Sequence, residues 1–222
     1  MDIINKKVVI IDYQLGNLFS VKQACDAVGI YSEISSDFNE ILNADALILP
    51  GVGAFIEAMN NLKKLDLVFA IKQKVNNGTP IFGICLGLQL LFTESEEFGA
   101  GNGLDLISGL IRRFPKSHKG QNVKVPHIAW NKIYKLNQNW ESSTLNGIGE
   151  NEFMYFIHSY FVRPDNDSVV LSLTNYDGIE FCSAIQQENI FATQFHPEKS
   201  ANKGISIYKN WGQINNLICQ KK

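Results

Sequence analysis

Short apolar runs recur through the first half of the chain, and each is closed by a polar, proline or glycine residue. The run VVIID covers residues 8–12, DALILP covers 45–50 and PIFGI covers 80–84, and the more polar YSEIS at 31–35 is predicted to be a further strand. Apolar, β-branched runs of this length are typical of buried strands. The pattern therefore predicts strands that are buried on both faces, as in a parallel sheet.

The stretches between these runs have helical spacing. Asn17 can cap a helix whose apolar positions extend from Leu18 to Val28, and Gly29 can end it. A second helical stretch covers roughly 55–76, and LGLQLLFTES at 86–95 turns into a helix directly after the last apolar run. Strands that alternate with helices predict an α/β fold with a mostly parallel sheet wound on both faces. In such sheets, ligands bind beyond the carboxyl ends of the strands.

The second half of the chain is different, because it is rich in closely spaced β patterns. These strands are expected to be antiparallel, with a tight hairpin turn at 187–190. A final helix is predicted over Lys203–Cys219, and 116–122 is expected to be a flexible loop. The predicted strands are EFMYFIHSYFV at 152–162, SVVLSLTNY at 168–176, EFCSAIQQ at 180–187 and IFATQF at 190–195.

Composition excludes several classes of protein. With 222 residues, 45% hydrophobic and 19% charged, the chain is long enough to bury a substantial core, and we expect one domain over 1–222. A net charge of −2 gives no overall attraction to nucleic acid or to an anionic membrane. We find no signal peptide pattern and no apolar run of membrane-spanning length. The 4 cysteines are scattered without a Cys-x-x-Cys pair, as expected of reduced thiols in a cytoplasmic protein.

One of these cysteines, Cys85, stands between two glycines in GICLG at 83–87. The arrangement Gly-x-nucleophile-x-Gly places a nucleophile on a strained turn between a strand and a helix, where flanking glycines make room for it. The dipole of the following helix then favours the reactive thiolate. The alternative is a buried cysteine that merely packs at a tight corner.

A nucleophilic thiol needs a base, and FATQFHPEKS at 191–200 offers one. His196 and Glu198 are two residues apart after a predicted strand, so in extended backbone both side chains point the same way. Glu198 could then fix the tautomer of His196, as the acid does in a serine protease triad. The alternatives are an ion pair on the surface and a metal site, which would lack an obvious third ligand.

A third candidate element is LPGVGAF at 49–55. Two glycines after a strand expose backbone N–H groups beyond the edge of the sheet. Such groups could form an oxyanion hole, a phosphate cradle or only a turn. The stretch lacks both the spacing of a dinucleotide fingerprint and the lysine of a phosphate loop.

Together these stretches resemble the class I glutamine amidotransferases, and within them the glutaminase subunits of imidazole glycerol phosphate synthases. The resemblance implies a flavodoxin-like, doubly wound sheet with an added antiparallel β region. It extends nearly end to end, through IIDYQLGNL, LILPGVGAF, GICLGLQLLF followed by SEE, KVPHIAWN, YFIHSYF and TQFHPEKS.

The resemblance also implies roles for particular residues and no metal or organic cofactor. Cys85, His196 and Glu198 would be the catalytic triad. The backbone of Leu86, Gly51 and Val52 would hold the oxyanion. The remaining expectations are Gln89, Glu94, His158, Ser159 and Tyr160 around the substrate, and Trp130, Tyr155 and Lys199 toward a partner.

The implied reaction is the hydrolysis of L-glutamine to glutamate, with ammonia passed to a TIM-barrel synthase subunit in a heterodimer. The acceptor would yield imidazole glycerol phosphate and AICAR in histidine biosynthesis. Gln14, Asp105 and Ala129 replace a commoner glycine of the family pattern. Because of these departures, the alternative is a paralogous amidotransferase subunit that supplies ammonia to a synthase-like partner for sugar amidation in the biosynthesis of surface polysaccharides.

Two other classes of protein also remain possible from the sequence. A non-enzymatic regulator with this fold would not need Cys85, His196 and Glu198 intact. A cysteine peptidase or deglycase on a similar sheet would lack the His-Pro-Glu element and the Gln89 contact.

Overall fold

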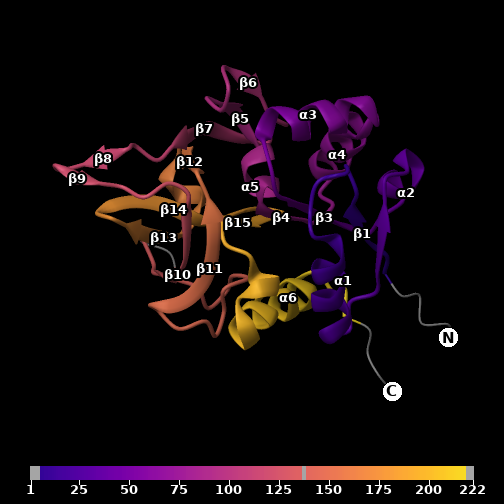
Figure 1. Cartoon of the computed structure of the whole chain (residues 1–222). Coiled ribbons are helices and arrows are strands. Elements are labelled where there is room, and N and C mark those ends of the chain that lie inside the picture. Colours follow the sequence, from indigo (N-terminus) through magenta and orange to yellow (C-terminus); the bar gives the residue numbers. More distant parts are fainter. Residues whose placement is uncertain (1–5, 137–138, 219–222) are drawn as a thin grey trace.

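The computed structural model describes residues 6–136 and 139–218, and its main element is the predicted doubly wound sheet (Figure 1). Strands β2, β1, β3, β4 and β15 run parallel, which is the flavodoxin-like part, and β14 and β13 extend the sheet antiparallel. In spatial order the strands are β13 (Val170–Tyr176), β14 (Ile179–Gln187), β15 (Ile190–Thr193), β4 (Ile81–Cys85), β3 (Ala46–Gly51), β1 (Val8–Ile11) and β2 (Ser32–Ser35).

Helices cover both faces of this sheet, because successive side chains of each strand point to opposite sides. Val8 and Ile10 of β1 pack in one apolar core, and Val9 and Ile11 in the other. The first core contains residues of α1 (Leu18–Ala27) and α6 (Ala201–Ile214). The second contains residues of α2 (Phe38–Leu42), α3 (Phe55–Lys64), α4 (Leu67–Asn76) and α5 (Leu86–Leu90).

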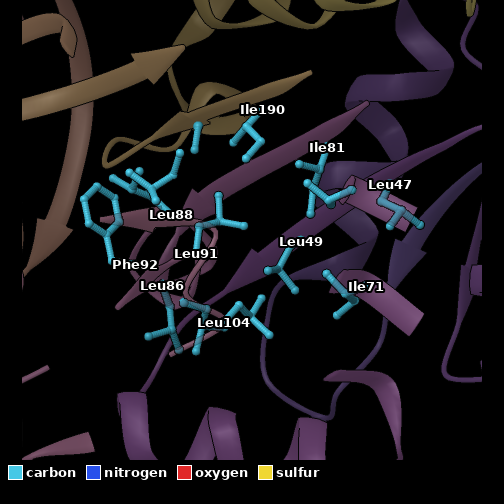
Figure 2. Packing of buried hydrophobic residues seen from close by; sticks show 14 of the residues in the cluster. Leu47, Leu49, Ile71, Ile81, Leu86, Leu88, Leu91, Phe92, Leu104 and Ile190 are labelled. Carbon is cyan, nitrogen blue, oxygen red and sulfur yellow. The ribbon is translucent and has the colours of Figure 1, made fainter. Parts of the chain in front are cut away.

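The second core brings the helix after Cys85 against the strands before it. Figure 2 shows Leu86 and Leu88 of α5 among residues of β3, β4 and β15, with Leu104 from a later loop closing the cluster. All of these side chains are almost fully buried. The tight packing fixes where α5 begins, and therefore where the residue before it stands.

The remaining strands form the added β region beside the main sheet (Figure 1). One sheet has the order β12-β7-β5-β6, and β10 pairs with β11 antiparallel. The bounds are β5 (Phe92–Ser95), β6 (Gly101–Asn102), β7 (Ile107–Arg113), β8 (Ser117–His118), β9 (Gln121–Asn122), β10 (His127–Ile133), β11 (Glu152–His158) and β12 (Tyr160–Pro164), with 3₁₀ turns η1 (Asp167–Val169) and η2 (Pro197–Lys199).

Several predicted elements differ from the observed ones. The stretch 55–76 is two helices, because Asp66 takes a left-handed conformation with φ of 58°. The helix after Cys85 ends at Leu90, and β5 follows it. The expected loop at 116–122 is instead a small hairpin of β8 and β9.

Two further boundaries were also wrong. The predicted strand 152–162 is divided into β11 and β12 at Ser159. The last helix covers Ala201–Ile214 rather than 203–219, and Cys219 lies outside the described residues. Within the described ranges, no helix has the length and apolar character needed to cross a membrane.

Candidate active site

Cys85 stands at the junction between β4 and α5 in a strained backbone conformation, with φ of 54° and ψ of −105°. The positive φ is unusual for a residue with a side chain, and it turns the chain sharply from strand to helix. Gly87 is required here, because a Cβ at this position would come within 1.7 Å of the Leu49 carbonyl oxygen. The predicted nucleophile elbow is therefore present.

His196 and Glu198 form a buried pair beside this elbow. His196 Nδ1 lies 2.8 Å from Glu198 Oε1, and both side chains are nearly inaccessible to solvent. The sequence predicted this pairing from extended backbone, but Glu198 lies in the 3₁₀ turn η2, which folds its carboxylate back onto the ring. Because Nδ1 faces the carboxylate, Nε2 is the nitrogen left for the nucleophile.

The ring of His196 interacts with the Cys85 sulfur. Burial lowers the pKa of His196, but negative charge on the nearby Cys85 sulfur, together with Glu198, outweighs burial and raises that pKa. His196 Nε2 is buried and makes no hydrogen bond among the described residues. The neighbouring sulfur and carboxylate therefore favour the protonated form of the His196 ring.

Two further groups contact the sulfur, and neither was predicted from the sequence. Cys85 Sγ lies 3.8 Å from the Ile157 carbonyl oxygen, which can accept a hydrogen bond from the thiol. The side-chain amide of Gln194 donates to Cys85 Sγ from 3.6 Å. These contacts join residues 72 and 109 positions apart along the chain, so sequence spacing could not reveal them.

A cavity of about 660 Å³ opens over the sulfur. Its wall includes most residues that the sequence predicted around a substrate. Of the expected set, Val52, Leu86, Gln89, His158, Ser159 and Tyr160 line it, and Gly53, Glu97, Phe98, Arg113, Pro126 and Ile157 join them.

Glu94 and Gly51 are not among the residues that line the cavity. Glu94 lies on β5, paired with Asn102, and the carboxylate in the cavity wall is that of Glu97. Glu97 Oε2 accepts a hydrogen bond from Phe55 N at 2.7 Å; burial raises the pKa of Glu97, and this bond opposes the shift. Gly51 is buried under the cavity, where a Cβ would lie 1.8 Å from the Tyr13 hydroxyl.

His158 belongs to a buried pair of histidines rather than to the base. His127 Nδ1 lies 3.1 Å from His158 Nε2, and His158 Nδ1 lies 2.8 Å from the Tyr160 carbonyl oxygen. Burial lowers the pKa of His127 to about 4, against the raising effect of Asp177. Burial and the neighbouring His127 lower the pKa of His158 to about 3. Both rings are therefore neutral near pH 7.

This pair makes folding sensitive to acid. Both groups bind a proton near pH 6.5 in the unfolded chain but only near pH 3 to 4 when folded, so acid stabilises the unfolded state. We expect full stability above about pH 6.5 and a loss of roughly 2 kcal/mol per imidazole near pH 5. The free energy of unfolding, measured in urea at about pH 7 and about pH 5, tests this expectation. His127→Phe, which keeps the ring stacking, should reduce the dependence on pH; an unchanged dependence would contradict this account.

Beside the cavity, β10 and β11 expose an apolar surface, the outer β10–β11 face, made of Ile128, Trp130, Lys132, Phe153, Tyr155 and Ile157. Trp130 is 49% exposed and packs edge-on against Tyr155, and Lys199 Nζ lies over the Tyr155 ring. Strand β11 is also bonded to the candidate active site, because the backbone carbonyl oxygen of Tyr155 accepts a hydrogen bond from the backbone N–H of His196 at 2.9 Å. The three residues predicted to face a partner therefore lie together.

Comparison with known proteins decides which family has this arrangement. The family model described as glutamine amidotransferase class-I matches residues 9–212. The chain belongs to this family. Relatives named imidazole glycerol phosphate synthase subunit HisH include those of Aquifex aeolicus, 46% identical over 92% of this chain and 95% of the relative, and Moorella thermoacetica, 44% identical over 94% and 95%.

Solved structures agree with the class I amidotransferase fold. A structure described as a glutamine amidotransferase superposes with a TM-score of 0.69 at 16% identity, covering 94% of this chain and 98% of the other. A chain of PurLQS from Thermotoga maritima gives 0.70 at 15% identity, covering 95% and 99%. At such identities the likeness concerns the fold alone.

The amidotransferase site has the groups needed for acyl transfer. It combines a cysteine at the turn from strand to helix, a histidine near its sulfur, a carboxylate bonded to that histidine, and the start of a helix at Leu86, whose N–H has no acceptor within the helix. The described residues contain no cluster of three or more side chains suited to hold a metal ion.

Proposed function

We propose that this chain is the glutaminase subunit of an imidazole glycerol phosphate synthase. It hydrolyses L-glutamine to glutamate and passes ammonia to a TIM-barrel synthase subunit bound as a heterodimer. The observation that carries the proposal is that Cys85, which lines the cavity, lies beside the buried pair of His196 and Glu198. The names of relatives that are 42–46% identical over most of the chain support this choice of synthase.

The reaction begins when the Cys85 thiolate attacks the side-chain carbonyl carbon of glutamine. His196 donates its Nε2 proton to the leaving nitrogen, so the carbon–nitrogen bond breaks and ammonia leaves. A glutamyl thioester remains on the sulfur. His196, now neutral, takes a proton from water, whose oxygen attacks the thioester and releases glutamate.

The negative oxygen formed in each step needs donors that are already in place. Leu86 at the start of α5 lines the cavity beside Cys85, and the Gly51–Val52 segment lies where β3 ends next to β4. Backbone N–H groups of this kind stabilise a tetrahedral intermediate by several kcal/mol, of the order of 3.

Charged groups in the cavity wall suit the α-amino and α-carboxylate groups of an amino acid. Glu97 offers a carboxylate for the ammonium group, and Arg113 offers a guanidinium for the carboxylate, beside the backbone of Ser159 and Tyr160. Gln89 uses its Nε2 within the protein, so its Oε1 is the atom available to the substrate amide. In this proposal Glu97, which lines the cavity, takes the role that was expected of Glu94 from the sequence.

The partner would dock on the outer β10–β11 face. Exposed Trp130 and the nearby Tyr155 and Lys199 provide an aromatic and basic surface of the kind that carries binding energy at interfaces. Ammonia released at Cys85 is close to this face, since Ile157 belongs both to it and to the cavity wall. Direct delivery matters because free ammonia is protonated at neutral pH and is then no nucleophile.

The proposal is tested with the synthase subunit of a relative and its ribonucleotide substrate. We expect little glutamate release from the chain alone, and release coupled to imidazole glycerol phosphate when the synthase is added. Trp130→Asp should weaken this activation about tenfold or more, because it removes an aromatic anchor and charges the face.

Phe98→Asp serves as a matched control, since Phe98 is 80% exposed and lines the cavity but is not part of the outer β10–β11 face. It should leave affinity for the synthase unchanged. No coupling between glutamine and the ribonucleotide would overturn the choice of acceptor, and transfer of nitrogen to a nucleotide-linked sugar would favour the sugar-amidating alternative.

A further inference from the structure

Gln194 is a fully buried polar residue that the proposed reaction leaves without a role. It lies between β15 and His196, and its backbone N–H donates to the Ser183 carbonyl oxygen at 2.9 Å. That bond ties its backbone to β14, so the side chain extends from a fixed position toward the elbow.

The orientation of the Gln194 amide follows from a carbonyl group at the other end of a short chain of hydrogen bonds. The Tyr160 carbonyl oxygen can only accept, so the atom of Gln89 that lies 2.9 Å from it must be the nitrogen. The same nitrogen donates to Gln194 at 3.2 Å, so that atom of Gln194 is the oxygen. The NH₂ group of Gln194 is thereby left 3.6 Å from Cys85 Sγ.

We propose that Gln194 is a catalytic residue whose side-chain amide donates a hydrogen bond to the Cys85 sulfur and stabilises the thiolate. This inference rests on the proposed function and adds a residue to its machinery. A donor bonds to the anionic sulfur more strongly than to the neutral thiol, and bonds to charged groups are about twice as strong as neutral ones. The two other polar contacts of the sulfur differ, since the Ile157 carbonyl accepts from the thiol and repels the thiolate.

The same bond contributes when the thioester is hydrolysed. Water adds to the thioester carbon, and its proton goes to His196. The carbon–sulfur bond then breaks, and its electron pair returns to sulfur as a thiolate. A donor held at the sulfur stabilises this leaving group, so Gln194 promotes both attack and release.

The test follows the alkylation of Cys85 by iodoacetamide, a small neutral probe, as a function of pH. The reaction is measured on the Cys85 peptide by mass spectrometry, which separates it from the other cysteines. Gln194→Met keeps the length of the side chain but has no donor. We expect its alkylation midpoint to rise by about 1 pH unit, the size of one charge-assisted hydrogen bond.

Other titratable groups also face the sulfur, and the variant leaves all of them in place. They are His196 with Glu198 behind it, Tyr13 under Gly51, and His158 and Glu97 in the cavity wall. Gln186→Met is the matched control, because Gln186 on β14 accepts from Thr144 N and does not contact the sulfur. Its alkylation curve should coincide with that of the unchanged chain.

Glutamine turnover gives a second readout. Gln194→Met should lower kcat/KM about tenfold at neutral pH, with recovery at higher pH, where the thiolate forms without help. Gln194→Glu provides a variant of the same shape if the methionine variant fails to fold. It still accepts from Gln89 but places an oxygen at the sulfur, so its midpoint should rise at least as far.

Coincident alkylation midpoints for the unchanged chain and whichever Gln194 variant folds would overturn the inference. Alkylation needs no glutamine, so its outcome is separable from that of the proposed function. A shifted midpoint in a chain that does not hydrolyse glutamine would leave the contact between Gln194 and the thiolate in place while removing the glutaminase.

Discussion

Cys85→Ala is expected to reduce glutamine hydrolysis at least about 10⁴-fold, to the level set by binding and the oxyanion donors alone. The sulfur forms the covalent bond to the substrate, and no other nucleophile is present at the elbow, where β4 ends and α5 begins. Alanine removes the sulfur without adding bulk next to Gly87, so the fold should be kept. The measurement is glutamate release in the presence of the synthase subunit.

Two controls make this result specific. Added ammonium salt should still support the synthase reaction, because the variant removes only the source of ammonia. Cys182→Ala should retain full hydrolysis, because Cys182 is a buried thiol of β14 whose sulfur contacts the Ala184 carbonyl rather than the active site. Turnover of glutamine by Cys85→Ala near the original rate would remove the proposed mechanism.

Glu198→Gln is expected to lower kcat by about 10³- to 10⁴-fold with little change in substrate binding. The carboxylate accepts from His196 Nδ1 at 2.8 Å, so it fixes the tautomer that leaves Nε2 facing the sulfur. It also stabilises the imidazolium, because Glu198 is one of the groups that raise the pKa of His196. An amide can present its NH₂ group to Nδ1 instead, which favours the wrong tautomer.

Glu180→Gln is the comparison for Glu198→Gln. Glu180 also accepts a side-chain hydrogen bond, from the Tyr134 hydroxyl at 2.7 Å, but it lies on the exposed end of β14. The change of charge is the same, so a loss confined to Glu198→Gln reports its contact with His196. Equal kcat in both variants would show that the buried carboxylate has no part in proton transfer.

Local sequence patterns predicted the parallel half of the fold because its strands are buried on both faces. A run such as VVIID can be assigned from its own residues, because a short continuous apolar run is typical of a strand that is buried on both faces. The helix after Asn17 was predicted for a similar reason: its cap bonds to Ser20, three residues away. Strands β5, β6, β7 and β10 were missed, because they are short or carry mixed polar and apolar positions.

The sequence by itself predicted the sharp turn at Cys85, the pair of His196 and Glu198, and the alternation of strands and helices in the parallel half, because each depends on residues within a few positions of one another. Only the tertiary structure decided that Glu97, and not Glu94, lines the cavity, and that Gln194 and Ile157 contact the sulfur. These facts depend on which segments pack together across many tens of residues. No local sequence pattern predicts such contacts, because polar side chains such as those of Glu97 and Gln194 could equally be exposed to solvent.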